Sequence, residues 1–218
     1  MSKYPLGPFA CSVRALNLYR PEFIQKLIQE ITQIDGWLCN AQIPIMWDMA
    51  GKIRGRMVEV GAWKGRTSLT LLSGADLTRF HLDVVDIFTG SAEHQETLKG
   101  ASTREEFEFN IFNHGYQDNV TIVQMPSVEA AKDYADESLD AAFIDAAHDY
   151  ENVKSDILAW YPKLKKGAPM LFHDYPHPDD PNGGFEELKR VLNEFVRDAT
   201  DKFEGWGFAA GLAGAYKK

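Results

Sequence analysis

The stretch Val58-Glu59-Val60-Gly61-Ala62-Trp63-Lys64-Gly65-Arg66-Thr67-Ser68 combines an apolar run, two glycines and the start of a helical pattern. This order is typical of a strand, a tight turn and a helix. Gly61 and Gly65 permit the turn and let the backbone approach a ligand closely. The two common phosphate-binding loops are excluded, because G-x-x-x-x-G-K-[ST] is absent and Trp63 occupies the second glycine position of G-x-G-x-x-G. Glu59 would repel a phosphate but suits a cationic ligand.

Short apolar runs alternate with helical patterns from residue 56 onward. The apolar runs predict strands at Met57–Val60, Leu82–Asp86, Val120–Gln124, Ala141–Asp145 and Met170–His173. The patterns between them predict helices at Thr67–Ser73, Thr103–Phe112, Ser127–Tyr134 and Tyr150–Leu164. This alternation favours βαβ units, and nearly continuous apolar strands are typical of a parallel sheet covered on both faces. We therefore predict a doubly wound α/β fold.

The flanking segments complete this organisation. The first 20 residues contain two prolines and a glycine and predict an irregular arm. Further helices are predicted from Pro21 to Ile34, over Ala41–Ile53 and over Phe185–Phe195, and the tail from Phe203 to Tyr216 predicts two strands antiparallel to each other. We expect a single domain over residues 1–218, with the arm and first helices in 1–55 and the cofactor-binding core in 56–218.

The longest region without a clear period is residues 87–102, after the second strand. Insertions of this kind often cover an active site, so we expect a lid that orders when cofactor or substrate binds.

The composition limits the function classes. The formal net charge of −9 is unlike that of a general nucleic-acid binder. The two cysteines, Cys11 and Cys39, form no disulfide framework or cysteine-rich zinc site. No signal peptide and no apolar run long enough to span a membrane is visible. We therefore expect a cytoplasmic protein that acts without nucleic acid or membrane partners.

A second acidic residue, Asp86, indicates that the ligand of the glycine loop is a nucleoside. Asp86 ends the second predicted strand, 25 residues after Gly61, close to the distance at which an acid binds ribose hydroxyls in nucleotide sites. Glu59 and Asp86 would then stand at adjacent strand ends. Two carboxylates in this arrangement suit a nucleoside that carries positive charge.

At this point the sequence resembles the class I S-adenosylmethionine-dependent methyltransferases, from about Gly36 to its end. The closer likeness is to the subgroup with the macrocin-type macrolide-sugar O-methyltransferases and the cephalosporin-hydroxylase-like proteins. The motifs that carry it are VEVGAWKGRTS at 58–68, VVDIFTGSAEH at 84–94, PSVEAA at 126–131, FIDAAHDYENVKSDI at 143–157 and LFHDY at 171–175. The resemblance implies a Rossmann-like, seven-stranded sheet of order 3-2-1-4-5-7-6, with strand 7 antiparallel.

The resemblance also implies the cofactor site. Glu59, Gly61 and Gly65 would line the methionine end of S-adenosylmethionine, Asp86 would bind the ribose, and Ser127 would lie beside the adenine. Asp145 would lie near the methionine moiety. The remaining expected cofactor-binding residues, from the glycine stretch itself, are Trp63 and Ser68.

The resemblance further implies a general base and a metal site. A histidine three residues after the acid of the fourth strand is the base in the macrolide-sugar enzymes, and His148 fills that position relative to Asp145. The subgroup holds a divalent metal with that acid and an adjacent acidic pair, where this chain has His173-Asp174. An imidazole weakens the case for Mg²⁺ and suits a transition metal on Asp145, His173 and Asp174. A buried, hydrogen-bonded His173 without any metal is the alternative.

The favoured function is therefore methyl transfer to a hydroxyl of a small molecule, such as a sugar or another secondary metabolite. Two other functions remain compatible with the sequence. One is a nicotinamide-dependent oxidoreductase, against which Trp63 and Glu59 argue; the other is a cofactor-binding module without catalysis. Both a monomer and a homodimer are compatible with the sequence, and nothing in it encodes the identity of the methyl acceptor.

Overall fold

The computed structural model describes residues 5–16, 19–90, 98–176 and 185–218. All seven strands in these ranges join one sheet of order β3-β2-β1-β4-β5-β7-β6. The strands are β1 (Gly55–Val60), β2 (Phe80–Val85), β3 (Val120–Val123), β4 (Ala141–Ile144), β5 (Pro169–Phe172), β6 (Phe203–Ala209) and β7 (Leu212–Lys217). Strands β1 to β5 pair in parallel, and β7 is antiparallel to both β5 and β6. The predicted strand order and the antiparallel seventh strand are confirmed.

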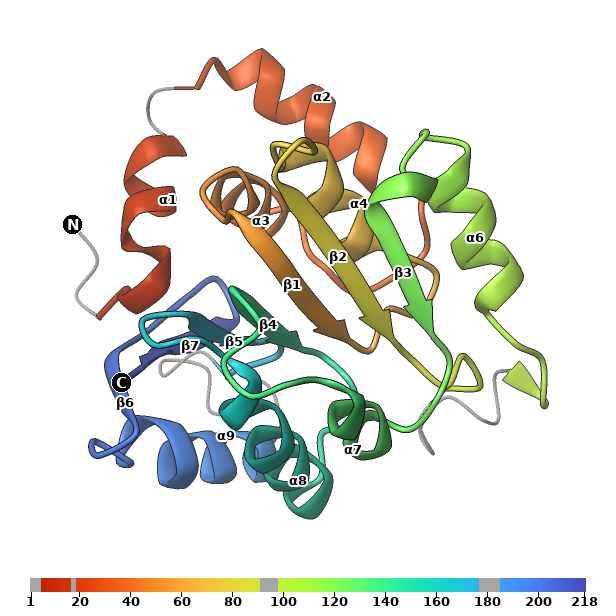
Figure 1. The fold of residues 1–218 in the computed structure, drawn as a ribbon. Helices are drawn as coiled ribbons and strands as arrows, with labels where there is room; N and C mark the ends of the chain where they lie inside the picture. The colour runs from red at the N-terminus through yellow and green to blue at the C-terminus, as the bar shows by residue number, and fades with distance from the viewer. Residues whose placement is uncertain (1–4, 17–18, 91–97, 177–184) are drawn as a thin grey trace.

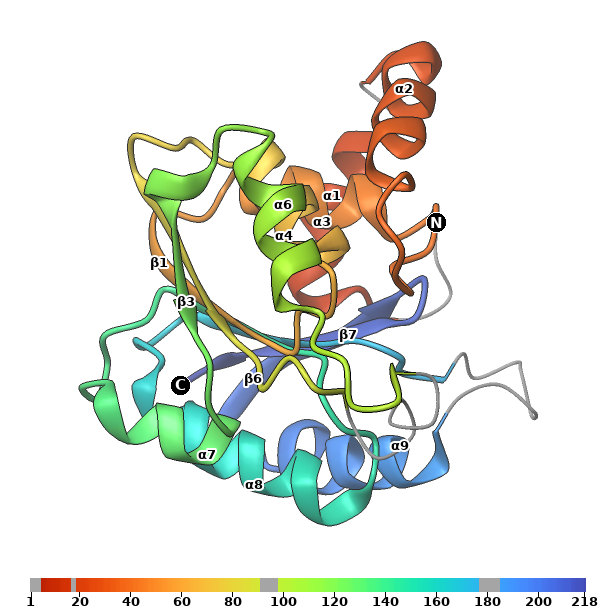
Figure 2. The ribbon, with the colours of Figure 1, turned by 90° about the vertical axis from the view of Figure 1, so that its right-hand side faces the viewer.

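Helices cover both faces of the sheet, as Figures 1 and 2 show. One face carries α1 (Ala10–Ala15), α2 (Pro21–Ile31), α3 (Ile43–Ala50), α4 (Arg66–Gly74) and α6 (Arg104–Phe112). The other carries α7 (Ser127–Ala130), α8 (Tyr150–Trp160) and α9 (Glu186–Leu192). Alternate residues of β1 enter the two apolar cores, with Met57 in one and Val58 in the other. A doubly wound fold follows from strands whose two faces are both apolar.

Local sequence explains where the helices begin. Pro21 opens α2, and Pro44 lies in the first turn of α3. Proline is tolerated there because the backbone N–H groups of a first turn have no acceptor within the helix. Gly65 precedes α4 in a left-handed conformation (φ 92°) that favours glycine. Asp149 caps α8, because its side chain accepts a hydrogen bond from the backbone N–H of Asn152 at 3.1 Å.

The prediction of an irregular N-terminal arm is wrong for much of its described part. Residues Gly7–Phe9 form a 3-10 helix that continues into α1, and Phe9 is fully buried. Leu6 forms an antiparallel bridge with Gly207 of β6, and the Pro5 carbonyl accepts a hydrogen bond from the Phe208 N–H at 2.9 Å. The arm therefore covers an edge strand, a contact that local propensity does not encode.

Other boundaries shift by a few residues. The long helix predicted at Tyr150–Leu164 ends as α8 at Trp160 and continues as a 3-10 turn, Tyr161–Lys163. The helix predicted at Phe185–Phe195 is α9 followed by a π-helical segment, Asn193–Arg197.

The predicted lid is only partly described, because residues 91–97 lie outside the described ranges. At its start, Phe88 is fully buried against Phe107 of α6, with ring centroids 5.4 Å apart. The Phe88 carbonyl also accepts a hydrogen bond from the Thr103 N–H at 2.9 Å. The start of the insertion is thus anchored to α6.

Within the described ranges, no helix is long and apolar enough to cross a membrane.

Candidate active site

A cavity of about 580 Å³ opens at the carboxyl ends of β1, β2 and β4. In open α/β sheets ligands bind at this edge, and the volume is within the usual range for a small-molecule pocket. Of the residues predicted to bind cofactor, Gly61, Trp63, Asp86, Ser127 and Asp145 line its wall.

The backbone at Gly61 leaves no room for a side chain. Its φ is 86°, and a Cβ atom there would lie 2.0 Å from the carbonyl oxygen of Asp145. The Gly61 N–H donates to the Val85 carbonyl at 2.9 Å, so the loop after β1 is tied to β2. Any other residue would push the β1 loop away from the β4 loop and open the cavity floor.

Asp86 organises the loop that follows β1. Its Oδ2 atom accepts hydrogen bonds from the backbone N–H groups of Ala62 at 2.7 Å and Trp63 at 3.0 Å. Its Oδ1 atom accepts one from the Phe88 N–H at 2.6 Å. These bonds fill both acceptor sites of Oδ2, whereas Oδ1 keeps one, so Asp86 can still accept a hydrogen bond from a ribose hydroxyl while it holds the loop.

Glu59 lies behind the cavity wall. It is fully buried, and its Oε2 atom accepts a hydrogen bond from the hydroxyl of Ser68 on α4 at 2.5 Å. Burial raises the pKa of Glu59 to about 8; the Ser68 bond opposes this rise, and nearby Asp145 and Asp86 add to it. Of the predicted cofactor-binding residues, Glu59, Gly65 and Ser68 are not among those that line the cavity.

Ser127, at the start of α7, is held by two side chains of α8. Its hydroxyl oxygen accepts a hydrogen bond from the indole N–H of Trp160 at 2.8 Å. Asp156 also lines the cavity; burial raises its pKa to about 6, against a hydrogen bond with Ser127 that lowers it. Sequence reasoning missed Asp156, because a single acid on a helix carries no positional signal.

The predicted polar cluster is brought together by the loops after β4 and β5. Donor atoms of Asp145, His148 and Asp174 lie within 4.8 Å of one another. The Nε2 atom of His148 is 3.2 Å from Oδ2 of Asp174. Asp174 has a left-handed backbone (φ 55°), a strained conformation for a residue with a side chain that often marks a functional position.

His173 lies beneath this cluster and is buried. Its Nε2–H donates to Oε1 of Gln42 at 3.0 Å, and that oxygen also accepts the Cys39 N–H at 2.7 Å. Its Nδ1 atom faces Oδ1 of Asp145 at 3.3 Å and Oδ2 of Asp174 at 3.1 Å. Burial lowers the pKa of His173, but the two carboxylates outweigh it and raise the pKa to about 10.

Asp174 responds in the opposite direction. Burial alone would raise its pKa, but hydrogen bonds from His148 and His173 and their charges hold the pKa well below its ordinary value. The carboxylate is therefore ionised at neutral pH.

The three clustered donors fit a divalent transition metal, because two carboxylate oxygens and one imidazole nitrogen suit such ions. The set differs from the one predicted from sequence. His148 belongs to the donor set and His173 does not. His173 directs Nδ1 at the two carboxylates and donates a hydrogen bond from Nε2 to Gln42. Gln42 precedes α3, 131 positions from His173, and no sequence signal indicated this contact.

Comparisons with known proteins agree with this geometry. The methyltransferase domain family matches residues 58–175, which is more than half of the chain. No curated protein gives a significant match.

Solved structures share the fold at low sequence identity. Cofactor-bound Rv0187 from MTB is 19% identical with a TM-score of 0.62, and 98% of each chain is covered. An O-methyltransferase from Bacillus cereus, solved with S-adenosylhomocysteine, is 12% identical with a TM-score of 0.61, covering 96% of this chain and 97% of that one. TomG from Streptomyces achromogenes, an O-methyltransferase of tomaymycin synthesis solved with S-adenosylmethionine, is 14% identical with a TM-score of 0.61, covering 96% of each chain.

The family match favours the methyltransferase among the functions that the sequence left open, and it argues against a nicotinamide-dependent oxidoreductase. The extent of that match, together with the strand order and the acid-lined cavity at the strand ends, shows that this chain belongs to the methyltransferase domain family of class I S-adenosylmethionine-dependent enzymes.

Proposed function

We propose that this enzyme transfers the methyl group of S-adenosylmethionine to a hydroxyl of a small molecule, with His148 as general base. The observation that carries the proposal is the placement of His148 and Asp174 beside the glycine loop in one cavity. The names of the similar B. cereus and S. achromogenes proteins, both O-methyltransferases, support the same acceptor atom. The finer likeness to macrolide-sugar enzymes is part of this proposal.

The cofactor would lie from the Gly61 loop to Ser127. Asp86 would accept a hydrogen bond from a ribose hydroxyl, and Ser127 would stand at the adenine end. The floor near Asp145 and Asp86 is acidic, which complements the positive sulfonium and amino groups of the cofactor.

His148 would take the proton of the acceptor hydroxyl. Because its Nε2 atom faces Asp174, we assign this role to Nδ1, with Asp174 fixing the tautomer as the acid does in Ser-His-Asp triads. The hydroxyl oxygen forms a bond to the methyl carbon as the carbon–sulfur bond breaks, so the sulfonium becomes a neutral thioether and the proton moves to the imidazole. In-line positioning of the two reactants would lower the barrier further.

A transition-metal ion, if bound, would be held by Asp145, His148 and Asp174. It would orient the acceptor oxygens and lower the pKa of the reacting hydroxyl. In that case Nε2 of His148 would be a ligand and Nδ1 would carry the ring's proton, so a metal-bound His148 would not also serve as the base. The metal and base roles of His148 are therefore alternatives, and the chelator assay below separates them.

The rim of the cavity indicates the kind of acceptor. Eight large hydrophobic side chains are exposed in the described part of the chain, and half of them line this cavity: Trp37, Ile87, Val128 and Phe185. An apolar rim above a polar floor suits an acceptor with an apolar or aromatic body that carries a hydroxyl.

The proposal is tested in two steps. Calorimetry with S-adenosylhomocysteine and with NAD should show binding of the first alone. Transfer of a radiolabelled methyl group to a panel of phenols, catechols and glycosides should then find an acceptor; labelling of amines or thiols but of no hydroxyl compound would contradict the proposal. Repeating the assay with a chelator and then with Mn²⁺ or Mg²⁺ separates the metal from the base, since full activity in chelator would remove the metal and keep His148.

A further inference from the structure

Phe185 stacks face to face on the imidazole of His148. The ring centroids are 3.8 Å apart and the ring planes differ by 5°. Phe185 lines the cavity and is 37% exposed, so it is not a buried core residue. A parallel stack this close puts one whole face of the imidazole in van der Waals contact with the phenyl ring.

The stack and the Asp174 contact constrain different motions of the same ring. The 3.2 Å contact between Nε2 of His148 and Oδ2 of Asp174 fixes one atom but leaves the ring free to turn about the line that joins them. The phenyl face of Phe185 blocks this turn, because it holds the plane of the imidazole. The two contacts together constrain the direction in which Nδ1 points.

Helix α9 holds Phe185 in place through Tyr150, two residues after His148. The Tyr150 N–H donates to Oε2 of Glu187 at 3.1 Å, and its hydroxyl donates to Oε2 of Glu194 at 2.7 Å. The guanidinium of Arg190 lies over the Tyr150 ring, 4.2 Å from its centroid. Phe185 directly precedes α9, so contacts from three side chains of this segment tie it to the chain that carries His148.

We propose that Phe185 is a positioning residue that holds the imidazole of His148 in the orientation needed to take the proton from the methyl acceptor. This rests on the proposed function, in which His148 is the base. Phe185 itself does not touch the reacting atoms. It acts by keeping Nδ1 directed at the hydroxyl, and it shields one face of the ring from water.

Proton NMR of the whole protein tests the stack without any acceptor. The ring protons of His148, assigned by their loss in His148→Ala, should be shifted upfield because they lie over the face of a phenyl ring. Phe185→Leu should remove this shift and Phe185→Tyr should keep it. An identical His148 shift in the wild type and in Phe185→Leu would overturn the proposal.

Kinetics with labelled S-adenosylmethionine and the best hydroxyl acceptor of the panel tests the consequence. Phe185→Leu should lower kcat about threefold to tenfold, the scale of one aromatic contact, with the KM values for both substrates nearly unchanged. Phe185→Tyr should restore kcat. Phe109→Leu is the matched control, because Phe109 is an exposed phenyl ring on α6 that does not line the cavity, and it should have no effect. A raised KM for the acceptor with unchanged kcat would overturn the proposal, since Phe185 would then be a contact for the acceptor itself.

The double variant separates action through His148 from any other action. In a His148→Ala background, Phe185→Leu should cause no further loss of kcat, because the ring that it positions is gone. The same fractional loss in both backgrounds would overturn the proposal while leaving the base in place. Full activity of His148→Ala would instead reject the base, and with it the purpose of the stack.

Discussion

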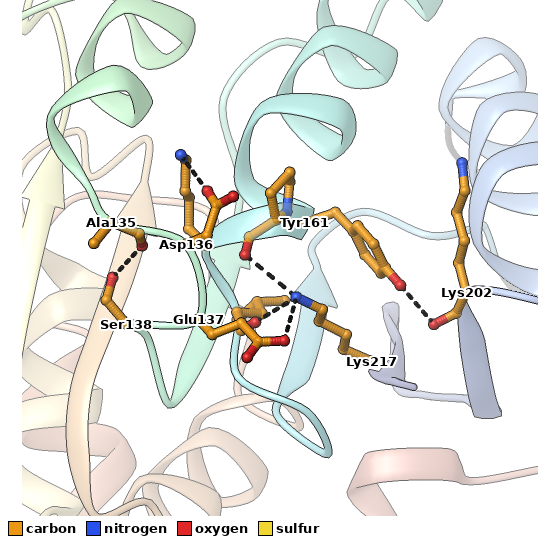
Figure 3. Close-up of polar contacts among 10 residues, drawn as sticks. Ala135, Asp136, Glu137, Ser138, Tyr161, Lys202 and Lys217 are labelled. Atoms are coloured by element: carbon orange, nitrogen blue, oxygen red, sulfur yellow. Dashed lines mark hydrogen bonds and ion pairs between the residues drawn. The ribbon is translucent and has the colours of Figure 1, made fainter.

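Buried ionisable groups at the two ends of the sheet differ in how fully hydrogen bonds replace their hydration. At the amino ends of the parallel strands, the buried ammonium group of Lys217 donates to the carbonyl oxygens of Leu164 at 2.7 Å and Pro162 at 3.2 Å and lies 3.7 Å from Oε1 of Glu137 (Figure 3). At the carboxyl ends, Glu59 is fully buried with one hydrogen bond, and its Oε1 atom has no partner among the residues that the structure describes. The first arrangement compensates the loss of hydration; the second does not.

The difference separates stability from function. Lys217 ties the last strand to the loops before β4 and β5, and every proton of its ammonium group has an oxygen nearby. At the cavity, Glu59 is buried close to Asp86 and Asp145, where a cationic cofactor would bind. Burial raises the pKa of Glu59, and the two neighbouring carboxylates raise it further. Proteins tolerate such local conflict at functional sites and compensate for it elsewhere. The following substitutions test this division.

The largest effect is expected at the base. His148→Ala should lower kcat by about 10²–10⁴-fold, because the hydroxyl would lose its proton acceptor. Cofactor affinity and melting temperature should change little, since His148 lies at the cavity and not in the core. Calorimetry and thermal denaturation provide the controls. A large fall in melting temperature would contradict the proposed separation of stability from function, because the cavity cluster would then be structural.

The next effect is a gain in stability at alkaline pH from replacing the buried carboxyl of Glu59. The folded pKa of Glu59 is about 8 against an ordinary 4.5, so the folded state keeps a proton that the unfolded state releases. This contribution is complete below pH 4.5 and is lost as the pH rises through 8, at a scale of a few kcal/mol.

Glu59→Gln should therefore flatten the dependence of unfolding free energy on pH and should make the variant more stable than the wild type at pH 9. Urea denaturation at pH 5, 7 and 9 measures this. If both proteins lose the same stability between pH 5 and pH 9, Glu59 is not the titrating group.

Lys217→Met should lower the free energy of unfolding by about 2–3 kcal/mol, because two buried carbonyl groups would lose a charged donor. The same substitution at Lys132, whose pair with Glu129 is exposed, should cost less than about 1 kcal/mol. Methyl transfer by the folded Lys217→Met protein should be normal. Lost activity at a temperature where the variant is fully folded would contradict the proposal that the amino ends of the strands serve stability alone.

Substitution of Asp86 should reduce both cofactor binding and stability, each by a smaller amount. Asp86→Ala should weaken cofactor binding by at least about tenfold through the lost ribose hydrogen bond to a charged acceptor. Its melting temperature should also fall, because the N–H groups of Ala62, Trp63 and Phe88 would lose their acceptor. Calorimetry and thermal denaturation report the two separately. Unchanged cofactor affinity together with a lower melting temperature would leave Asp86 with a structural role alone.

The sequence by itself determined the sheet and the edge at which the site forms. Apolar strands alternating with amphipathic helices are a local pattern, and a doubly wound sheet is the arrangement that buries both faces of such strands. The glycines at 61 and 65 marked the loop, since left-handed turns favour glycine, and Asp86 and Asp145 followed from their places at strand ends. Each of these features depends on residues that are close in the chain.

The tertiary structure alone decided which groups meet inside the site. His173, expected among the metal ligands, donates to Gln42 of a distant segment, while His148 joins Asp145 and Asp174 in the donor cluster. Phe185 reaches the imidazole of His148 only because α9 packs on the start of α8. Contacts between segments far apart in sequence depend on helix packing and on loop paths, and a period of two or 3.6 residues carries no information about either.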